Sequence, residues 1–131
     1  MPALALLASP LAYAAHMGGF LPHNTAHTVY PYGKAVDPDS GFPCHVTVQH
    51  GNYYGAAYAK IKSNSVNCYK IRISVTALQD GDLKTRFTRT IINPTPGRWY
   101  QAHLKFSNIV GSGLYTQDEY GRTKSWSYAG I

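Results

Sequence analysis

The chain has 131 residues, and its 12 lysines and arginines exceed its six aspartates and glutamates to give a formal net charge of +6. A chain of this length makes one ordinary domain with a single hydrophobic core, so a second domain is excluded. No apolar run reaches the roughly 20 residues that a membrane-spanning helix needs, so we expect no transmembrane segment. The positive charge favours anionic partners such as nucleic acid, anionic envelope polymers or acidic polysaccharide.

The first 14 residues, MPALALLASPLAYA, form an uncharged apolar run that ends in Ala-Tyr-Ala. Signal peptidase cuts after such a small-residue pattern, so we expect a signal peptide at 1–14 and a secreted, extracellular mature chain. The alternative is an apolar strand or a short buried helix. A complete signal peptide carries Lys or Arg before the apolar run, and none stands there. We therefore expect the true start to lie upstream.

Residues 15–43 are rich in Gly, Pro, His and Asn and lack sustained periodicity, which predicts an irregular arm. Within this arm, Asp37 and Asp39 match half of a calcium-binding loop, but the remaining ligands are missing. The histidines also lack the spacing of a metal site on a strand or helix. We therefore predict no bound metal and no cofactor.

From residue 44 to residue 131 the pattern changes to short alternating segments separated by turn residues, which is typical of an all-β domain. Gly51-Asn52 predicts a tight turn, and Asp80-Gly81 predicts a hairpin. We expect a small, single-domain antiparallel sandwich or barrel, because either hides its sheet edges. About seven strands are expected, at 44–50, 53–62, 67–77, 83–92, 98–109, 113–119 and 123–129.

Cys44 and Cys68 are the only cysteines. In an exported chain, two cysteines are expected to pair, so we predict one disulfide between them. The competing interpretation is a metal site, but no C-x-x-C spacing is present. The disulfide is therefore the favoured prediction.

Side-chain alternation along the strands separates core positions from exterior positions. On the strand at 67–77, the odd positions from Tyr69 to Ala77 are expected to face the core. On the strand at 98–109, the even positions from Tyr100 to Phe106 are expected to do so. The exterior should then combine basic and aromatic side chains on one shared face. The predicted ligand-binding residues are Lys60, Lys62, Lys70, Arg72, Lys84, Arg86, Trp99, His103 and Lys105.

The stretch TRFTRTIINPTPGRWYQAHLKF, residues 85–106, resembles the C-terminal half of secreted microbial guanyl-specific ribonucleases, which are small, basic, disulfide-bonded enzymes. The resemblance implies that Arg86 or Arg89 would stabilise the phosphorane and that His103 would protonate the leaving oxygen. The chain departs from that family on the preceding strand, where a glutamate base is required and only basic and hydroxyl side chains stand. It also lacks a pattern for the helix that the family carries before its sheet.

No carboxylate pair or nucleophile motif suited to acid-base or covalent catalysis is present, so a role other than an enzyme is favoured. We expect a secreted, monomeric binding or effector protein whose basic and aromatic face docks on an anionic polymer or cell envelope, with an antimicrobial or competition role. The alternatives are a secreted ribonuclease-like enzyme and a structural extracellular protein without a specific ligand.

Overall fold

The computed structural model describes residues 17–31, 44–79 and 83–130. The predicted signal peptide, Asp37, Asp39 and the Asp80-Gly81 turn lie outside these ranges. Within them the chain forms nine strands and no helix, so none of the described segments could cross a membrane as a helix. The all-β prediction is confirmed, with nine strands in place of seven.

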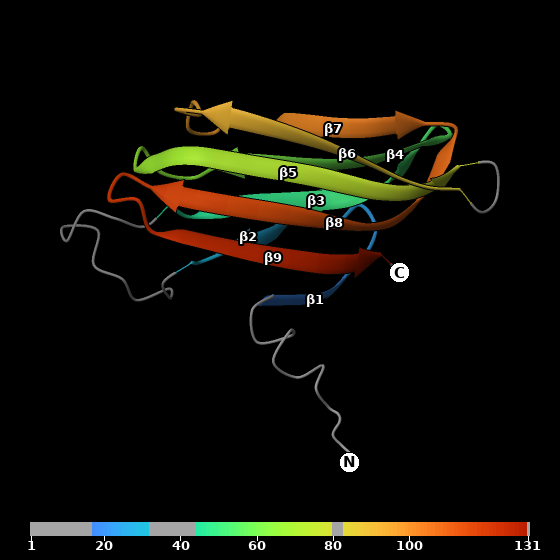
Figure 1. The fold of residues 1–131 in the computed structure, drawn as a ribbon, viewed down its shortest axis with the longest axis horizontal. Coiled ribbons are helices and arrows are strands. Elements are labelled where there is room, and N and C mark those ends of the chain that lie inside the picture. Colours follow the sequence, from blue (N-terminus) through green and yellow to red (C-terminus); the bar gives the residue numbers. More distant parts are fainter. Residues whose placement is uncertain (1–16, 32–43, 80–82, 131) are drawn as a thin grey trace, which may run out of the picture.

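The strands form two sheets, which Figure 1 shows one behind the other. Every strand pair is antiparallel except β1 with β9, which run parallel. Sheet A has the order β1 (Met17–Leu21), β9 (Thr123–Gly130), β8 (Ser107–Asp118), β5 (Cys68–Gln79) and β6 (Leu83–Ile92). Sheet B has the order β2 (His27–Val29), β3 (Val46–Tyr53), β4 (Ala56–Ser63) and β7 (Tyr100–Lys105).

The hydrophobic core lies between the two sheets, where β4 packs against β5 and β8. Alternate residues of β3, β4 and β5 supply much of it, and Ile61 on β4 and Ile73 on β5 are fully buried. Burying one such aliphatic side chain stabilises the fold by about 1.5–3 kcal/mol. The predicted inward positions of β5 from Ile71 to Ala77 are confirmed. The opposite positions of the same strands are thereby directed outward, which fixes the two outer faces described below.

Two predicted core positions are wrong, and in both cases the strand is interrupted. Tyr69 is 41% exposed, because the pairing of β5 with β8 shifts register between Cys68 and Lys70. Phe106 is 84% exposed and has a positive φ of 57°. It stands between β7 and β8, where the chain leaves sheet B for sheet A. The single strand expected at 98–109 is therefore two strands in different sheets.

The predicted turn at Gly51-Asn52 is also wrong, because β3 continues through both residues. The hairpin turns at Tyr54 and Gly55, which have φ values of 49° and 78° between the paired residues Tyr53 and Ala56. Two left-handed central residues correspond to a type I′ turn, whose twist suits a two-residue hairpin. The β3–β4 hairpin is thus longer than expected by three residues on its first strand.

The expected irregular arm contributes two strands to the sandwich. Its described part, 17–31, contains β1 beside β9 and β2 beside β3. The loop between them also contacts the sheet, since the Asn24 amide donates to the His50 carbonyl at 2.7 Å. No strand pattern is visible in the sequence of the arm, because the partner of β1 is a parallel strand more than a hundred residues away.

The predicted disulfide between Cys44 and Cys68 is confirmed, with a Cα–Cα distance of 4.6 Å. Cys68 is the first residue of β5 in sheet A, and Cys44 stands two residues before β3 in sheet B. The bond therefore joins the two sheets at one end of the sandwich.

Candidate ligand-binding surfaces

The predicted ligand-binding residues divide between the two outer faces of the sandwich. The outer face of sheet B carries Lys60, Lys62, Trp99, His103 and Lys105. The outer face of sheet A carries Lys70, Arg72, Lys84 and Arg86. These faces point in opposite directions, because the core lies between the sheets. The expectation of one shared cationic face is therefore wrong, and each face must be considered separately.

The centre of the sheet B face is a pair of lysines over one indole ring. Lys60 and Lys62 are two residues apart on β4 and so point to the same side. Their amines lie 4.5 and 4.9 Å from the centroid of the Trp99 ring. A cation over an aromatic face gains about 0.5–1 kcal/mol at an exposed site, which offsets part of the repulsion between the amines. The ring thus holds two positive charges close together.

No carboxylate of the described ranges neutralises these two amines. The one ion pair within 17–31, 44–79 and 83–130 joins Arg122 to Asp118 at 2.7 Å. The same carboxylate accepts the amides of Tyr120 and Arg122, so it organises the turn between β8 and β9. Lys60 and Lys62 therefore present charge that an external anion can neutralise.

A polar hollow of about 420 Å³, lined by amide, phenol and amine side chains, lies beside Lys60. Its lining residues are Asn24, Gln49, Tyr53, Tyr58, Lys60 and Gln101. The Tyr58 hydroxyl donates to Asn24 Oδ1 at 2.6 Å and accepts from Gln49 Nε2 at 2.9 Å. Gly51 makes room for this contact, because a Cβ there would overlap the Asn24 side chain. The hollow therefore has a fixed floor of amide and phenol groups.

His103 and Lys105 extend the sheet B face along β7. They lie across from Tyr58 and Ala56 in the β4–β7 ladder. Together with Trp99 and Gln101 they form a row in which every second residue points outward, spanning about 20 Å at the rise of an extended strand. A linear ligand could follow this row from the two lysines to Lys105.

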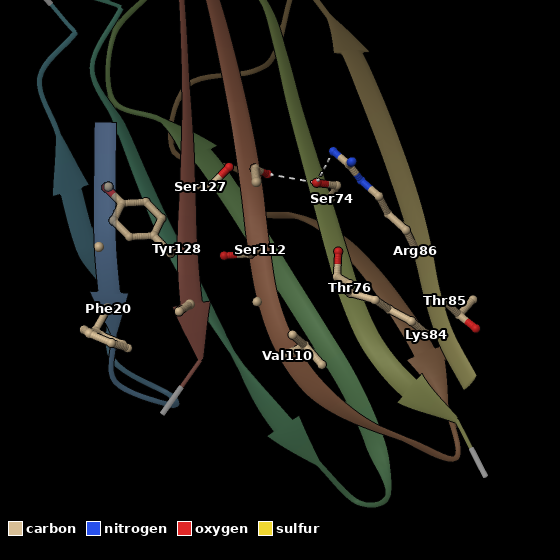
Figure 2. Close-up of a pocket in the computed structure, with 15 residues that line it drawn as sticks. Phe20, Ser74, Thr76, Lys84, Thr85, Arg86, Val110, Ser112, Ser127 and Tyr128 are labelled. Atoms are coloured by element: carbon tan, nitrogen blue, oxygen red, sulfur yellow. Dashed lines mark hydrogen bonds between the residues drawn. The ribbon is translucent and has the colours of Figure 1, made fainter. Parts of the chain in front are cut away.

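The sheet A face is hollowed by a groove of about 1070 Å³, and Figure 2 shows Phe20 on β1 at one side and Lys84 and Arg86 on β6 at the other. Its floor has small residues, namely Gly18, Ser74, Gly111, Gly113, Ser127 and Ala129. Arg86 Nη2 donates to Ser74 Oγ at 3.3 Å. The remaining two predicted residues of this face do not line the groove: Arg72 stacks on the Tyr115 ring at 4.5 Å, and Lys70 lies further along β5.

The ribonuclease-like pairing of Arg86 with His103 is not assembled. Arg86 lies on the outer face of sheet A, whereas His103 lies on the outer face of sheet B. Arg89 reaches β7, but its guanidinium donates to the Gln101 carbonyl at 3.1 Å. The implied pairing of Arg86 with His103 on one phosphodiester is therefore wrong.

The sequence identified the lysines, Trp99 and His103, but it missed the hollow beside them. Asn24 comes from the supposed arm, and Tyr53 was placed after a turn that does not exist. The residues Gln49 and Gln101 carry no signal of their own in a β pattern. Elsewhere in the described ranges, no three His, Cys, Asp or Glu side chains gather where they could hold a metal ion.

Comparisons of the chain with protein families, characterised proteins and solved structures find no match. Its function is therefore inferred from the chemistry of the two faces.

Proposed function

We propose that the protein is an extracellular binding module that docks on an anionic polymer, such as a cell-envelope polymer, through the outer face of sheet B. The observation that supports this proposal is the convergence of the Lys60 and Lys62 amines on the Trp99 ring. Neither amine has an ion-pair partner within the described ranges. The Cys44–Cys68 disulfide is compatible with an oxidising, extracellular environment.

A polymer suits this face better than a single small anion. Two amines over one ring can contact one or two anionic groups, and Lys105 extends the positive charge to the far end of β7. Each contact made with a densely charged chain releases counterions, so several modest contacts add to a useful affinity that falls with salt. The antimicrobial or competition role expected from the sequence stays a prediction that depends on this docking.

Trp99 supplies the direct test. The chain has two tryptophans, and Trp126 is only 4% exposed in the core, so a polymer-induced change in fluorescence reports on Trp99. The purified protein is titrated with poly(glycerol phosphate), with a polyuronate and with a single-stranded oligonucleotide. We expect the emission to change with at least one of them. The double variant Lys60→Gln/Lys62→Gln should weaken that interaction by about tenfold or more, because each lysine near an anionic surface contributes about 1 kcal/mol.

The matched control is Lys84→Gln/Arg86→Gln, which removes the same charge from the opposite face. Its affinity, read at Trp99, should stay within about threefold of the wild type, because exposed charges beyond a Debye length are largely screened. Equal weakening by the two double variants would show that net charge alone drives binding. No response to any of the three polymers would also overturn the proposal.

A further inference from the structure

We propose that the preferred ligand of the sheet B face is an acidic polysaccharide, with a sugar ring in the polar hollow and its anionic group at Lys60 and Lys62. This inference rests on the proposed function, since it names the class of polymer that the same face binds. It follows from the way in which charge, amides and an aromatic ring stand side by side.

Two side-chain amides lie on either side of the charged Lys60. Gln49 on β3 and Gln101 on β7 are the cross-strand neighbours of Lys60, one on each side. Directly opposed residues on one sheet face have Cβ atoms about 4.5–5.5 Å apart. An anionic group at the Lys60 amine therefore lies within reach of an amide on either side. Amides both donate and accept, as sugar hydroxyls do, whereas phosphate oxygens only accept.

The two glutamines differ in how far they are already engaged. Gln49 Nε2 donates to the Tyr58 hydroxyl, which is in turn held by Asn24. The side-chain amide of Gln101 makes no hydrogen bond with another described residue, and the residue is exposed. Gln49 is thus oriented by the floor of the hollow, and Gln101 is available to a ligand.

An aromatic ring stands at the far side of the hollow from Trp99. Tyr53 is 65% exposed and lines the hollow at the end of β3. Its ring lies 4.4 Å from that of Tyr54, and the type I′ turn fixes both residues. An exposed ring on a rigid turn offers an apolar surface to the carbon face of a sugar, while the edges of the sugar meet the amides. Trp99 is less suited to this role, because the two lysines lie over its ring.

A ligand that binds through charge alone would make no contact that uses the Tyr53 ring or the Gln101 amide. Poly(glycerol phosphate) satisfies Lys60 and Lys62 but offers few rings to Tyr53 and few donors to Gln101. An oligonucleotide offers bases to stack on Tyr53, and its phosphates accept hydrogen bonds as carboxylates do, but its esterified sugars offer few free hydroxyl groups to the amides. A polyuronate supplies a carboxylate, hydroxyl donors and acceptors, and a ring in each unit.

The test compares how two double variants, one of Tyr53 and Gln101 and one of Lys60 and Lys62, change the binding of different polymers. A polyuronate oligomer, poly(glycerol phosphate), a single-stranded oligonucleotide and the neutral oligosaccharide of the same length are titrated against the protein, with Trp99 fluorescence as the readout. We expect the polyuronate oligomer to bind most tightly. Tyr53→Ala/Gln101→Ala should weaken polyuronate binding by about tenfold, because it removes a stacking ring and a hydrogen-bonding amide. The same variant should change poly(glycerol phosphate) binding by less than about twofold, whereas Lys60→Gln/Lys62→Gln should weaken the binding of both.

Tyr53 and Gln101 are exposed, and their truncation removes no core contact, so these variants should fold. Denaturation midpoints equal to that of the wild type provide the control. Tighter binding of the oligonucleotide or of poly(glycerol phosphate) than of the polyuronate would overturn the inference and leave the proposed function standing. An unchanged polyuronate affinity in Tyr53→Ala/Gln101→Ala would do the same. The proposed function itself fails if none of the charged polymers alters the Trp99 signal, or if Lys60→Gln/Lys62→Gln and Lys84→Gln/Arg86→Gln weaken binding equally.

Discussion

His50 is a fully buried ionisable side chain that connects three elements. Its Nε2 atom lies 2.7 Å from the Leu21 carbonyl and must donate to it, so Nδ1 accepts from the Ser112 hydroxyl at 2.6 Å. Burial lowers the pKa of His50, the hydrogen bond to Leu21 partly opposes that shift, and the nearby His23 ring lowers the pKa further. The neutral ring therefore fits its site, where it joins β3 to β8 and to the end of β1.

Acid should destabilise the fold through this residue. An unfolded histidine binds its proton near pH 6.5, and the folded state binds it only at lower pH, so the unfolded chain holds more protons between these two values. The free energy of unfolding should thus fall as the pH drops below about 6.5. Burial lowers the pKa of His45 in the same direction.

Urea denaturation at about pH 7.5 and about pH 5.5 measures the effect, on the wild type and on His50→Gln. We expect the variant to lose less stability between the two pH values, because the group that resists protonation is gone. An identical loss in both proteins would show that His50 does not carry the pH dependence.

At the scale of strands, side-chain alternation correctly predicted the core positions that local sequence determines. It failed where contacts between distant segments decide the turn and the choice of sheet. The run from Ile71 to Ala77 was placed correctly because every second residue is apolar. The turn was misplaced because Gly51 is required for the approach of Asn24, whereas the actual turn uses Tyr54 in a conformation that tyrosine rarely adopts. Nothing local showed that the chain would change sheets at Phe106.

Two glycines of β8 test how closely sheet A is packed. A Cβ on Gly111 would lie 2.5 Å from the backbone oxygen of Tyr128, which cannot move away without displacing β9. A Cβ on Gly113 would lie 2.8 Å from Ser74 Oγ, which can rotate. Gly111→Ala should therefore cost about 1–3 kcal/mol and Gly113→Ala less. The urea midpoints of the two variants measure the difference, and a larger loss in Gly113→Ala would contradict this packing.

The disulfide acts at the scale of the whole molecule, because it joins the two sheets. Cross-linking Cys44 to Cys68, 24 residues apart, removes loop entropy from the unfolded chain that is worth about 3 kcal/mol on the chain-entropy model. Cys44→Ala/Cys68→Ala should lose about that much stability while keeping its β-sheet circular dichroism. Equal denaturant midpoints for the variant and the oxidised wild type would contradict the assignment.

The division of the basic residues between two faces is also a whole-molecule property. Alternation correctly predicted that Lys60, Lys62 and Arg72 point outward. It could not predict that β4 and β5 belong to different sheets, because that follows from the pairing of β4 with β7 and of β5 with β8. The candidate site was therefore half predicted: its cations were found in the sequence, and the surroundings of those cations were not.

The docking of an anionic polymer at Lys60, Lys62 and Trp99 is the central claim, and the salt dependence of binding tests it most directly. The Trp99-reported affinity for the preferred charged polymer is measured over a series of salt concentrations, for the wild type, Lys60→Gln/Lys62→Gln and Lys84→Gln/Arg86→Gln. The logarithm of affinity should fall linearly with the logarithm of salt concentration, and the Lys60→Gln/Lys62→Gln slope should be shallower by about one unit per lysine. The wild-type slope should persist in Lys84→Gln/Arg86→Gln. A wild-type affinity that does not change with salt, or equal slopes in all three proteins, would contradict the claim.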